Sequence, residues 1–105
     1  DLIKGHILSI EYLQHKEGLT PINLGTGNKH SVLELIHAFE KVNNISVNYR
    51  YDDRRDGDIP ISYADPGFAL HELSWKPAKS LEDMCGDSWQ AIHSNKLDFP
   101  GINLK

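Results

Sequence analysis

The sequence contains a single cysteine, Cys85, so no disulfide bond can form within the chain. The net charge of −4 provides no basic surface for nucleic acid or for an acidic membrane. No apolar run approaches the roughly 20 residues that span a bilayer, and no signal peptide is visible. We therefore expect a cytoplasmic protein, in keeping with the lone thiol, that has no nucleic-acid or membrane partner.

The chain is also short and poor in apolar residues. Its 105 residues make one domain at most, spanning 1–105, and apolar residues form only 39% of them. That fraction is below the usual range for an independent globular domain, and it is typical of a piece that shares its core with a neighbour. The chain opens on Asp1, not on Met, directly into a predicted helix. We expect a piece of a longer protein.

Residues that usually carry catalysis or metal binding are sparse. The six histidines form no pair at ligand spacing, and they have no cysteine cluster beside them that would bind zinc. No nucleophile stands next to a base, and no two carboxylates share one face at a useful spacing. We assign no metal ligand and no catalytic residue to this chain.

Apolar periodicity predicts helices in the first half of the chain. Residues 2–17 carry apolar side chains at spacings of three and four, and Gly18 is suited to end that helix. A second helix begins after Ser31, because Ser31 and Glu34 stand at the spacing of a capping box.

The second half predicts two more helices. Asp65-Pro66 starts a short helix that ends near Leu73, and Ser80 with Asp83 caps the last helix. Three intervening segments are predicted to be extended, at 22–24, 45–51 and 61–64. The predicted fold is α/β, in the order α-β-α-β-α-α, with a tail from Leu97 that we expect to be loosely held.

A pair of glycines follows the first extended segment. Gly25 and Gly27 allow close approach of a phosphate to the backbone, as in nucleotide-binding loops. The pattern lacks the third glycine of a dinucleotide fingerprint and the Lys-Ser/Thr of a P-loop. We favour the simpler interpretation, that these glycines only turn the chain toward the next helix.

A charged loop over residues 52–60 provides the second candidate site. An arginine fork matches a phosphate with two hydrogen bonds, a carboxylate accepts from a sugar diol, and Gly57 allows a tight turn. The charged residues in and beside this loop are Arg50, Asp52, Asp53, Arg54, Arg55, Asp56 and Asp58. Composition alone leaves two interpretations open, a nucleoside-diphosphate clamp and a solvated turn of mixed charge.

Several segments, in order, resemble the UDP-glucose 4-epimerase family of extended short-chain dehydrogenases/reductases. The resemblance covers nearly the whole chain. It is carried by Ile22–Gly27, Ser31–Glu34, Arg54–Asp58, Tyr63–Pro66, Glu72–Pro77 and Ser80–Trp89. The sequence departs from the commonest motif at Asp56, where the family usually has Glu or Pro.

The resemblance implies a division of labour between two domains. In the family, NAD and the catalytic Ser/Thr, Tyr and Lys belong to an amino-terminal Rossmann domain, and the carboxy-terminal domain holds the UDP-sugar. We therefore expect this chain to be the carboxy-terminal UDP-sugar-binding domain, without cofactor-binding residues or a catalytic Tyr-x-x-x-Lys pair. Its expected partners are a UDP-sugar and its own Rossmann domain, in a homodimeric enzyme.

Four positions correspond to substrate-binding residues of the family. Arg55 corresponds to the arginine on the diphosphate, and Asp58 to the acid on the nucleotide side of the substrate. Val32 falls near the uridine. Ser62 stands at a position beside the hexose, where a small residue is expected to admit an N-acetyl group.

Two other functions stay open at this point. One is the corresponding lobe of a related NDP-sugar dehydratase or reductase. The other is a non-catalytic module that binds nucleotide sugars.

Overall fold

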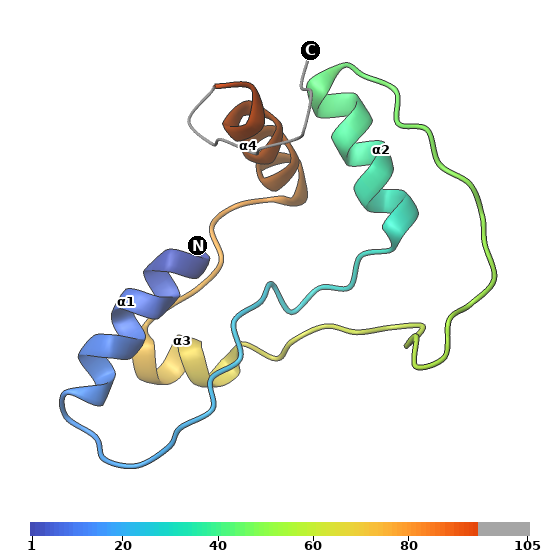
Figure 1. Ribbon diagram of the computed structural model, residues 1–105. Coiled ribbons are helices and arrows are strands. Elements are labelled where there is room, and N and C mark those ends of the chain that lie inside the picture. Colours follow the sequence, from blue (N-terminus) through green and yellow to red (C-terminus); the bar gives the residue numbers. More distant parts are fainter. Residues whose placement is uncertain (95–105) are drawn as a thin grey trace. The chain divides into compact units, whose positions relative to one another are not determined.

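The computed structural model describes residues 1–94, which form four helices and two compact units (Figure 1). The helices are α1 (Leu2–Leu13), α2 (Val32–Asn43), α3 (Gly67–Leu73) and α4 (Leu81–His93). The first unit joins Asp1–Lys29 to Arg54–Ala78, and the second joins His30–Asp53 to residues 79–94. The predicted loose tail from Leu97 lies outside the described residues.

In the first unit, α1 packs against α3 around a small core. That core consists of Ala69, Leu73 and Trp75, with Leu8, Tyr12, Ile22 and Leu24 packed against it. The Trp75 indole N–H donates a hydrogen bond of 3.0 Å to the backbone carbonyl of Asp1. The rings of Tyr12 and Phe68 meet edge to face, with centroids 6.1 Å apart. These contacts hold both ends of the first unit together although they are far apart in the sequence.

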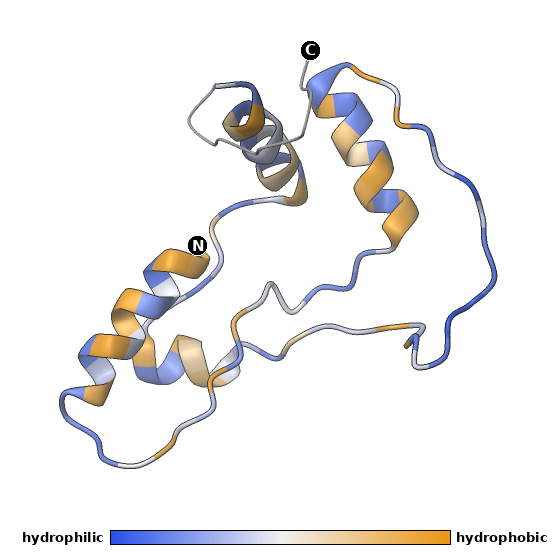
Figure 2. Ribbon diagram, in the orientation of Figure 1, coloured by the Kyte–Doolittle hydropathy of each residue, from blue (hydrophilic) through white to orange (hydrophobic). Residues whose placement is uncertain are grey.

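The predicted apolar stripe of α1 lies on the exposed side of the helix. Its side chains are 50–76% exposed, and they are Leu2, Ile3, Ile7, Ile10 and Leu13. The face that packs is instead marked by Gly5, Leu8 and Tyr12. Figure 2 shows α1 as largely hydrophobic along its length. A helix that is apolar on two sides requires a second surface against it, so the period was predicted correctly and the buried face was not.

In the second unit, α2 packs against α4. The Phe39 and Trp89 rings meet edge to face at 5.5 Å, and the Asn43 side-chain amide donates to the backbone carbonyl of Cys85 at 3.3 Å. Cys85 itself is buried, 3% exposed. The core of this unit is therefore the contact between α2 and α4. At the end of α2, the Asn43 side chain binds the backbone of α4.

Both predicted capping boxes are confirmed. The Ser31 hydroxyl accepts from the Glu34 N–H at 3.1 Å while the Glu34 carboxylate accepts from the Ser31 N–H at 2.7 Å. Ser80 and Asp83 make the same reciprocal pair at 3.1 and 2.9 Å. Each box satisfies two backbone donors that the first turn of a helix leaves without an intrahelical partner.

Two helix boundaries differ from the prediction. α1 ends at Leu13, because the N–H groups of Gln14 and His15 turn back to Glu11 and Tyr12 in three-residue steps. Gly18, with φ +88°, lies in the loop beyond that end. α3 begins at Gly67, one residue after the predicted position, and Pro66 occupies the cap.

The α/β prediction is not confirmed, because residues 1–94 contain no strand. The segments 22–24, 45–51 and 61–64 lie outside the helices but do not pair with one another. A strand is defined by hydrogen bonds to a neighbour, which alternation in the sequence does not supply. The Val47 N–H donates instead to the Glu40 carboxylate, at 3.3 Å.

Candidate functional site

The charged loop contains a tight turn at residues 55–58. The Asp58 N–H donates to the Arg55 carbonyl at 3.1 Å, which closes a four-residue β-turn. Gly57, the third residue of the turn, has φ +88°, whereas Asp56 has no positive φ. That combination defines a type II turn, which requires glycine at the third position for steric reasons. Gly57 of the Arg-Asp-Gly-Asp motif is thus a structural requirement of this turn.

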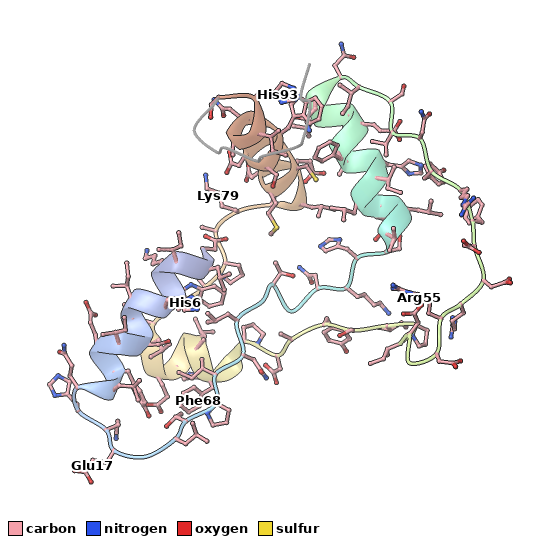
Figure 3. The ribbon with its side chains drawn as sticks, viewed as in Figure 1. His6, Glu17, Arg55, Phe68, Lys79 and His93 are labelled. Atoms are coloured by element: carbon pink, nitrogen blue, oxygen red, sulfur yellow. The ribbon has the colours of Figure 1, made fainter. Side chains whose placement is uncertain are left out.

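The side chains of Arg55 and Asp58 close the same turn. The Asp58 Oδ2 accepts from the Arg55 backbone N–H at 3.1 Å and from its Nε–H at 3.4 Å, and Oδ1 accepts from Nη2 at 3.3 Å. Both groups remain accessible, the Arg55 side chain 87% exposed and that of Asp58 41%. Figure 3 shows Arg55 on the irregular segment between α2 and α3. The structure therefore brings together two of the four predicted substrate residues.

The other charged residues of the loop do not join this pair. Arg50 forms an exposed ion pair with Asp52 at 3.6 Å, and both belong to the second unit. The Asp52 carboxylate also accepts from the Asp53 N–H at 2.9 Å. The part of the loop with a defined guanidinium geometry is therefore Arg55 to Asp58.

The remaining two predicted residues are both exposed. Ser62 lies in the first unit, four residues after Asp58 in the chain. Val32 is the first residue of α2, is 73% exposed and belongs to the second unit. Each side chain is accessible to a ligand.

The glycine pair has a packing explanation, whereas the sequence interpretation gave these glycines only a role in turning the chain toward the next helix. A Cβ added to Gly25 would lie 2.8 Å from the Cβ of Ala64, too close for any side chain. Gly27 has φ +75°, and a Cβ there would be 3.5 Å from the Pro66 ring. These glycines let two chain segments approach each other within the first unit, which accounts for them without a phosphate.

Contrary to expectation, the spacing Tyr-x-x-x-Lys does occur once, at Tyr12 and Lys16. Helix α1 ends before Lys16, whose ammonium group lies over the Tyr12 ring, 6.0 Å from its centroid. The other side of that ring packs on the core and on Phe68. A search for the spacing alone would have found this pair, but its geometry is that of a packed tyrosine with a cation above it.

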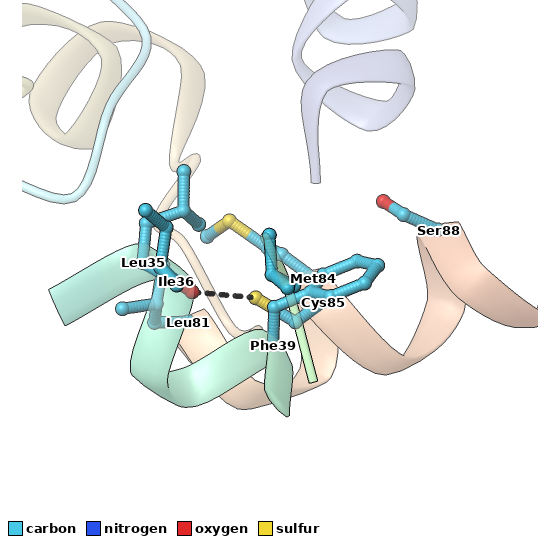
Figure 4. A pocket seen from close by; sticks show the side chains of 8 residues that line it. Leu35, Ile36, Phe39, Leu81, Met84, Cys85 and Ser88 are labelled. Carbon is cyan, nitrogen blue, oxygen red and sulfur yellow. Dashed lines mark hydrogen bonds between the residues drawn. The ribbon is translucent and has the colours of Figure 1, made fainter. Parts of the chain in front are cut away.

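The second unit contains an apolar groove of about 400 Å³ (Figure 4). Its lining comes largely from α2 and α4, and consists of Leu35, Ile36, Phe39, Val47, Leu81, Met84, Cys85 and Ser88. With one hydroxyl among eight lining residues, the groove offers almost nothing that would bind a diphosphate or a sugar. Within residues 1–94, no group of three or more His, Cys, Asp or Glu side chains is placed to hold a metal ion.

The groove contains one thiol, that of Cys85, and burial sets its pKa. Burial raises the pKa of the Cys85 thiol, and the charge of Glu82 raises it further. The sulfur lies 4.0 Å from the Leu35 carbonyl oxygen, the contact drawn in Figure 4. Cys85 is therefore a neutral core residue and has none of the electropositive surroundings that activate a thiolate.

The chain is similar to UDP-glucose 4-epimerases from bacteria and animals, which confirms the predicted resemblance. It is 47% identical to that of Bacillus subtilis over 95 residues, covering 90% of this chain and 28% of the relative. It is 46% identical to that of Pasteurella multocida and 39% to that of Homo sapiens, each over 99 residues and 94% of this chain. The chain thus spans 28–29% of the length of these relatives. No family model matches it.

A solved structure is similar to this chain. The UDP-glucose 4-epimerase of Bifidobacterium longum, in complex with NAD+ and UDP, superimposes with a TM-score of 0.79 and 42% sequence identity. The match covers 91% of this chain and 29% of that one. The fold described above is therefore shared with part of an enzyme crystallised with UDP.

Proposed function

We propose that this chain is the substrate-binding region of an NAD-dependent UDP-glucose 4-epimerase, and that Arg55, on the turn at residues 55–58, holds the UDP moiety. The observation that carries the proposal is the fixed guanidinium of Arg55 on an exposed type II turn. It is supported by 39–47% identity to UDP-glucose 4-epimerases over most of the chain. A permanently charged, planar fork is suited to a diphosphate at any physiological pH.

The proposed roles follow the order of groups in the substrate. Arg55 binds the diphosphate, Asp58 contacts the nucleotide side of the substrate, and Val32 lies near the uridine. Ser62 stands beside the hexose. Holding the nucleotide end leaves the sugar free to react elsewhere in the active site, so this region contributes binding and orientation and no chemical step.

NAD belongs, in this proposal, to another part of the protein. The glycine pair here is occupied by close packing against Ala64 and Pro66, which leaves no room at Gly25 for a pyrophosphate to approach the backbone. The residues present in this chain do not fit the cofactor. The catalytic residues are likewise assigned outside the chain, because the Tyr12 ring is engaged in packing.

The proposal includes two structural partners. The exposed apolar stripe on α1 supports a second protein surface against it, which we assign to the Rossmann domain of a homodimeric, cytoplasmic enzyme. The extended segments 22–24 and 45–51 would then complete a sheet with strands from outside the chain. Along the latter, half-buried Ile45 and Val47 alternate with exposed Ser46, as expected of a strand with one covered face. No helix in the described part of the chain has the length and hydropathy to cross a membrane.

Conversion of UDP-glucose to UDP-galactose by the full-length protein tests the proposal. Turnover is expected with bound or added NAD, and Arg55→Ala is expected to raise KM much more than it lowers kcat. A protein that binds UDP-glucose but converts it to a dehydrated or reduced product would favour the alternative NDP-sugar enzymes. Binding without any turnover would favour the non-catalytic module. The similarity to named epimerases favours neither alternative.

Ser62 leads to a finer proposal on specificity. A small, exposed side chain at the hexose position leaves room for an N-acetyl group, so the full-length enzyme is proposed to accept UDP-N-acetylglucosamine as well as UDP-glucose. Ser62→Tyr would fill that room and abolish only the acetylated activity. Equal loss of both activities, or no acetylated turnover in the wild type, would contradict the proposal.

A further inference from the structure

The Arg55–Asp58 pair divides the guanidinium into two edges. Asp58 accepts from Nε and Nη2, the side-on edge of the fork. The adjacent, end-on edge is formed by Nη1 and by the second N–H of Nη2. Among the described residues, no hydrogen bond or ion pair involves Nη1. Asp58 therefore leaves one bidentate edge of Arg55 free to bind a second anion.

The Asp58 carboxylate, like the Arg55 guanidinium, is held in place by hydrogen bonds within the turn. The Asp58 Oδ2 also accepts the backbone N–H of Arg55, and the Asp58 N–H donates to the carbonyl of Arg55. Four hydrogen bonds thus join the same two residues through both backbone and side chain. Arginine loses considerable rotamer freedom when it binds a ligand, so a fork that is already held loses less on binding.

We propose that Asp58 is a positioning residue, which holds the side-on edge of Arg55 so that its end-on edge meets the diphosphate. This inference rests on the proposed function and deepens it. It gives Asp58 a role besides the nucleotide-side contact proposed above, because its carboxylate accepts three hydrogen bonds from Arg55.

The two roles for Asp58 make opposite predictions for a ligand without a ribose. Asp58→Asn and the matched control Asp56→Asn each remove one negative charge from the same turn, but only Asp58 contacts Arg55. Their affinities for UDP and for inorganic pyrophosphate are compared by calorimetry in the full-length protein. If Asp58 is a positioning residue, Asp58→Asn weakens the binding of both ligands about threefold to fivefold. A loss of this size is at the upper end of the range for an exposed ion pair. Asp56→Asn leaves both affinities equal or slightly tighter, since one repelling charge is gone.

A double-mutant cycle completes the test. In the background of Arg55→Ala, Asp58→Asn is expected to change pyrophosphate affinity less than twofold, because the residue through which it acts is absent. The nitrogen-proton signal of Arg55 Nε should shift in Asp58→Asn without any ligand and stay unchanged in Asp56→Asn. If Asp58→Asn lowers the affinity for UDP but leaves the affinity for pyrophosphate unchanged, the inference is wrong and Asp58 is a ribose ligand. A wild-type protein that binds neither ligand contradicts the proposed function itself.

Discussion

The indole N–H of Trp75 donates to the backbone carbonyl of Asp1, which also accepts the first helical hydrogen bond of α1 from Gly5. One carbonyl oxygen thus joins the start of α1 to the segment after α3. Trp75 is only 3% exposed, so its ring is almost fully buried. The first unit depends on this contact because its core is otherwise small.

Trp75→Phe should therefore destabilise the protein by about 1–3 kcal/mol, from a lost hydrogen bond at a buried site and a smaller ring. Urea denaturation measures the change. Trp89→Phe is the matched control, since Trp89 packs mainly through its ring against Phe39 and His93 and loses less by the exchange. Equal losses in the two variants would show that the hydrogen bond to Asp1 contributes nothing particular.

Gly5 is the second sensitive position in this contact. A Cβ at Gly5 would lie 2.6 Å from a terminal carbon of Leu24 and 3.2 Å from the Trp75 indole nitrogen. Alanine normally favours a helix by about 1 kcal/mol over glycine, but crowding of a packed core costs typically about 1–3 kcal/mol. We expect Gly5→Ala to destabilise the protein in a urea titration. A second helical variant, Gly86→Ala, meets only one methyl group at 3.1 Å and should be tolerated better. Stabilisation by Gly5→Ala would contradict the packing.

The sequence predicts the parts of the fold that depend on neighbouring residues. Both capping boxes follow from a serine with an acid three residues later, and the αL end of α2 at Asn44 follows from the Asn43-Asn44 pair. The type II turn needs Gly57 at its third position. These features require no knowledge of distant contacts, which is why the pattern alone suffices.

The predictions that the structure does not confirm depend on contacts with distant residues, which a sequence pattern cannot specify. The alternation from Ile45 to Tyr51 predicts a surface covered on one side, yet no strand pairs with it in the described residues. The stripe on α1 predicts a buried face, but its side chains are exposed, and Leu8 and Tyr12 pack against the core instead. For the site, the sequence predicts Arg55 and Asp58 but not that they bind each other.

Stability at low pH should report on the α4 cap. Hydrogen bonds from Ser80, first from its backbone N–H and then from its side chain, hold the pKa of Asp83 below its ordinary value of 3.8. A carboxyl whose pKa is lowered by folding stabilises the folded state above the ordinary value, and that contribution is lost as the pH falls through the folded value. Denaturation midpoints at about pH 6 and about pH 3 should therefore differ more in the wild type than in Asp83→Asn.

The control for this pH effect is Asp87→Asn, which removes a carboxylate from the same helix outside its cap. Its pH dependence should match that of the wild type. Separately, Ser80→Ala should cost about 1 kcal/mol at neutral pH through loss of the cap. If Asp83→Asn leaves the pH dependence unchanged, the carboxylate does not stabilise the folded helix.

Cys85 should react slowly with thiol reagents. Its sulfur is buried and its pKa is raised, so both access and thiolate fraction are low. In the native protein, the labelling rate should be roughly tenfold or more below that of a small free thiol, and it should rise with urea as α2 and α4 separate. Replacing Phe39 by alanine should loosen this contact and speed labelling. A native rate equal to that of the free thiol would contradict the packing of the second unit.

The central claim is that the turn at residues 55–58 binds the diphosphate of a UDP-sugar through Arg55. The most direct test is a calorimetric titration of the full-length protein with UDP, in the wild type and in Arg55→Ala. Arg54→Ala is the control, because it removes the same charge one residue away, where no carboxylate fixes the side chain. The account predicts at least about a tenfold loss of UDP affinity in Arg55→Ala, as for a lost charge-assisted hydrogen bond, and less than about threefold in Arg54→Ala. Equal affinities in the wild type and Arg55→Ala would contradict it.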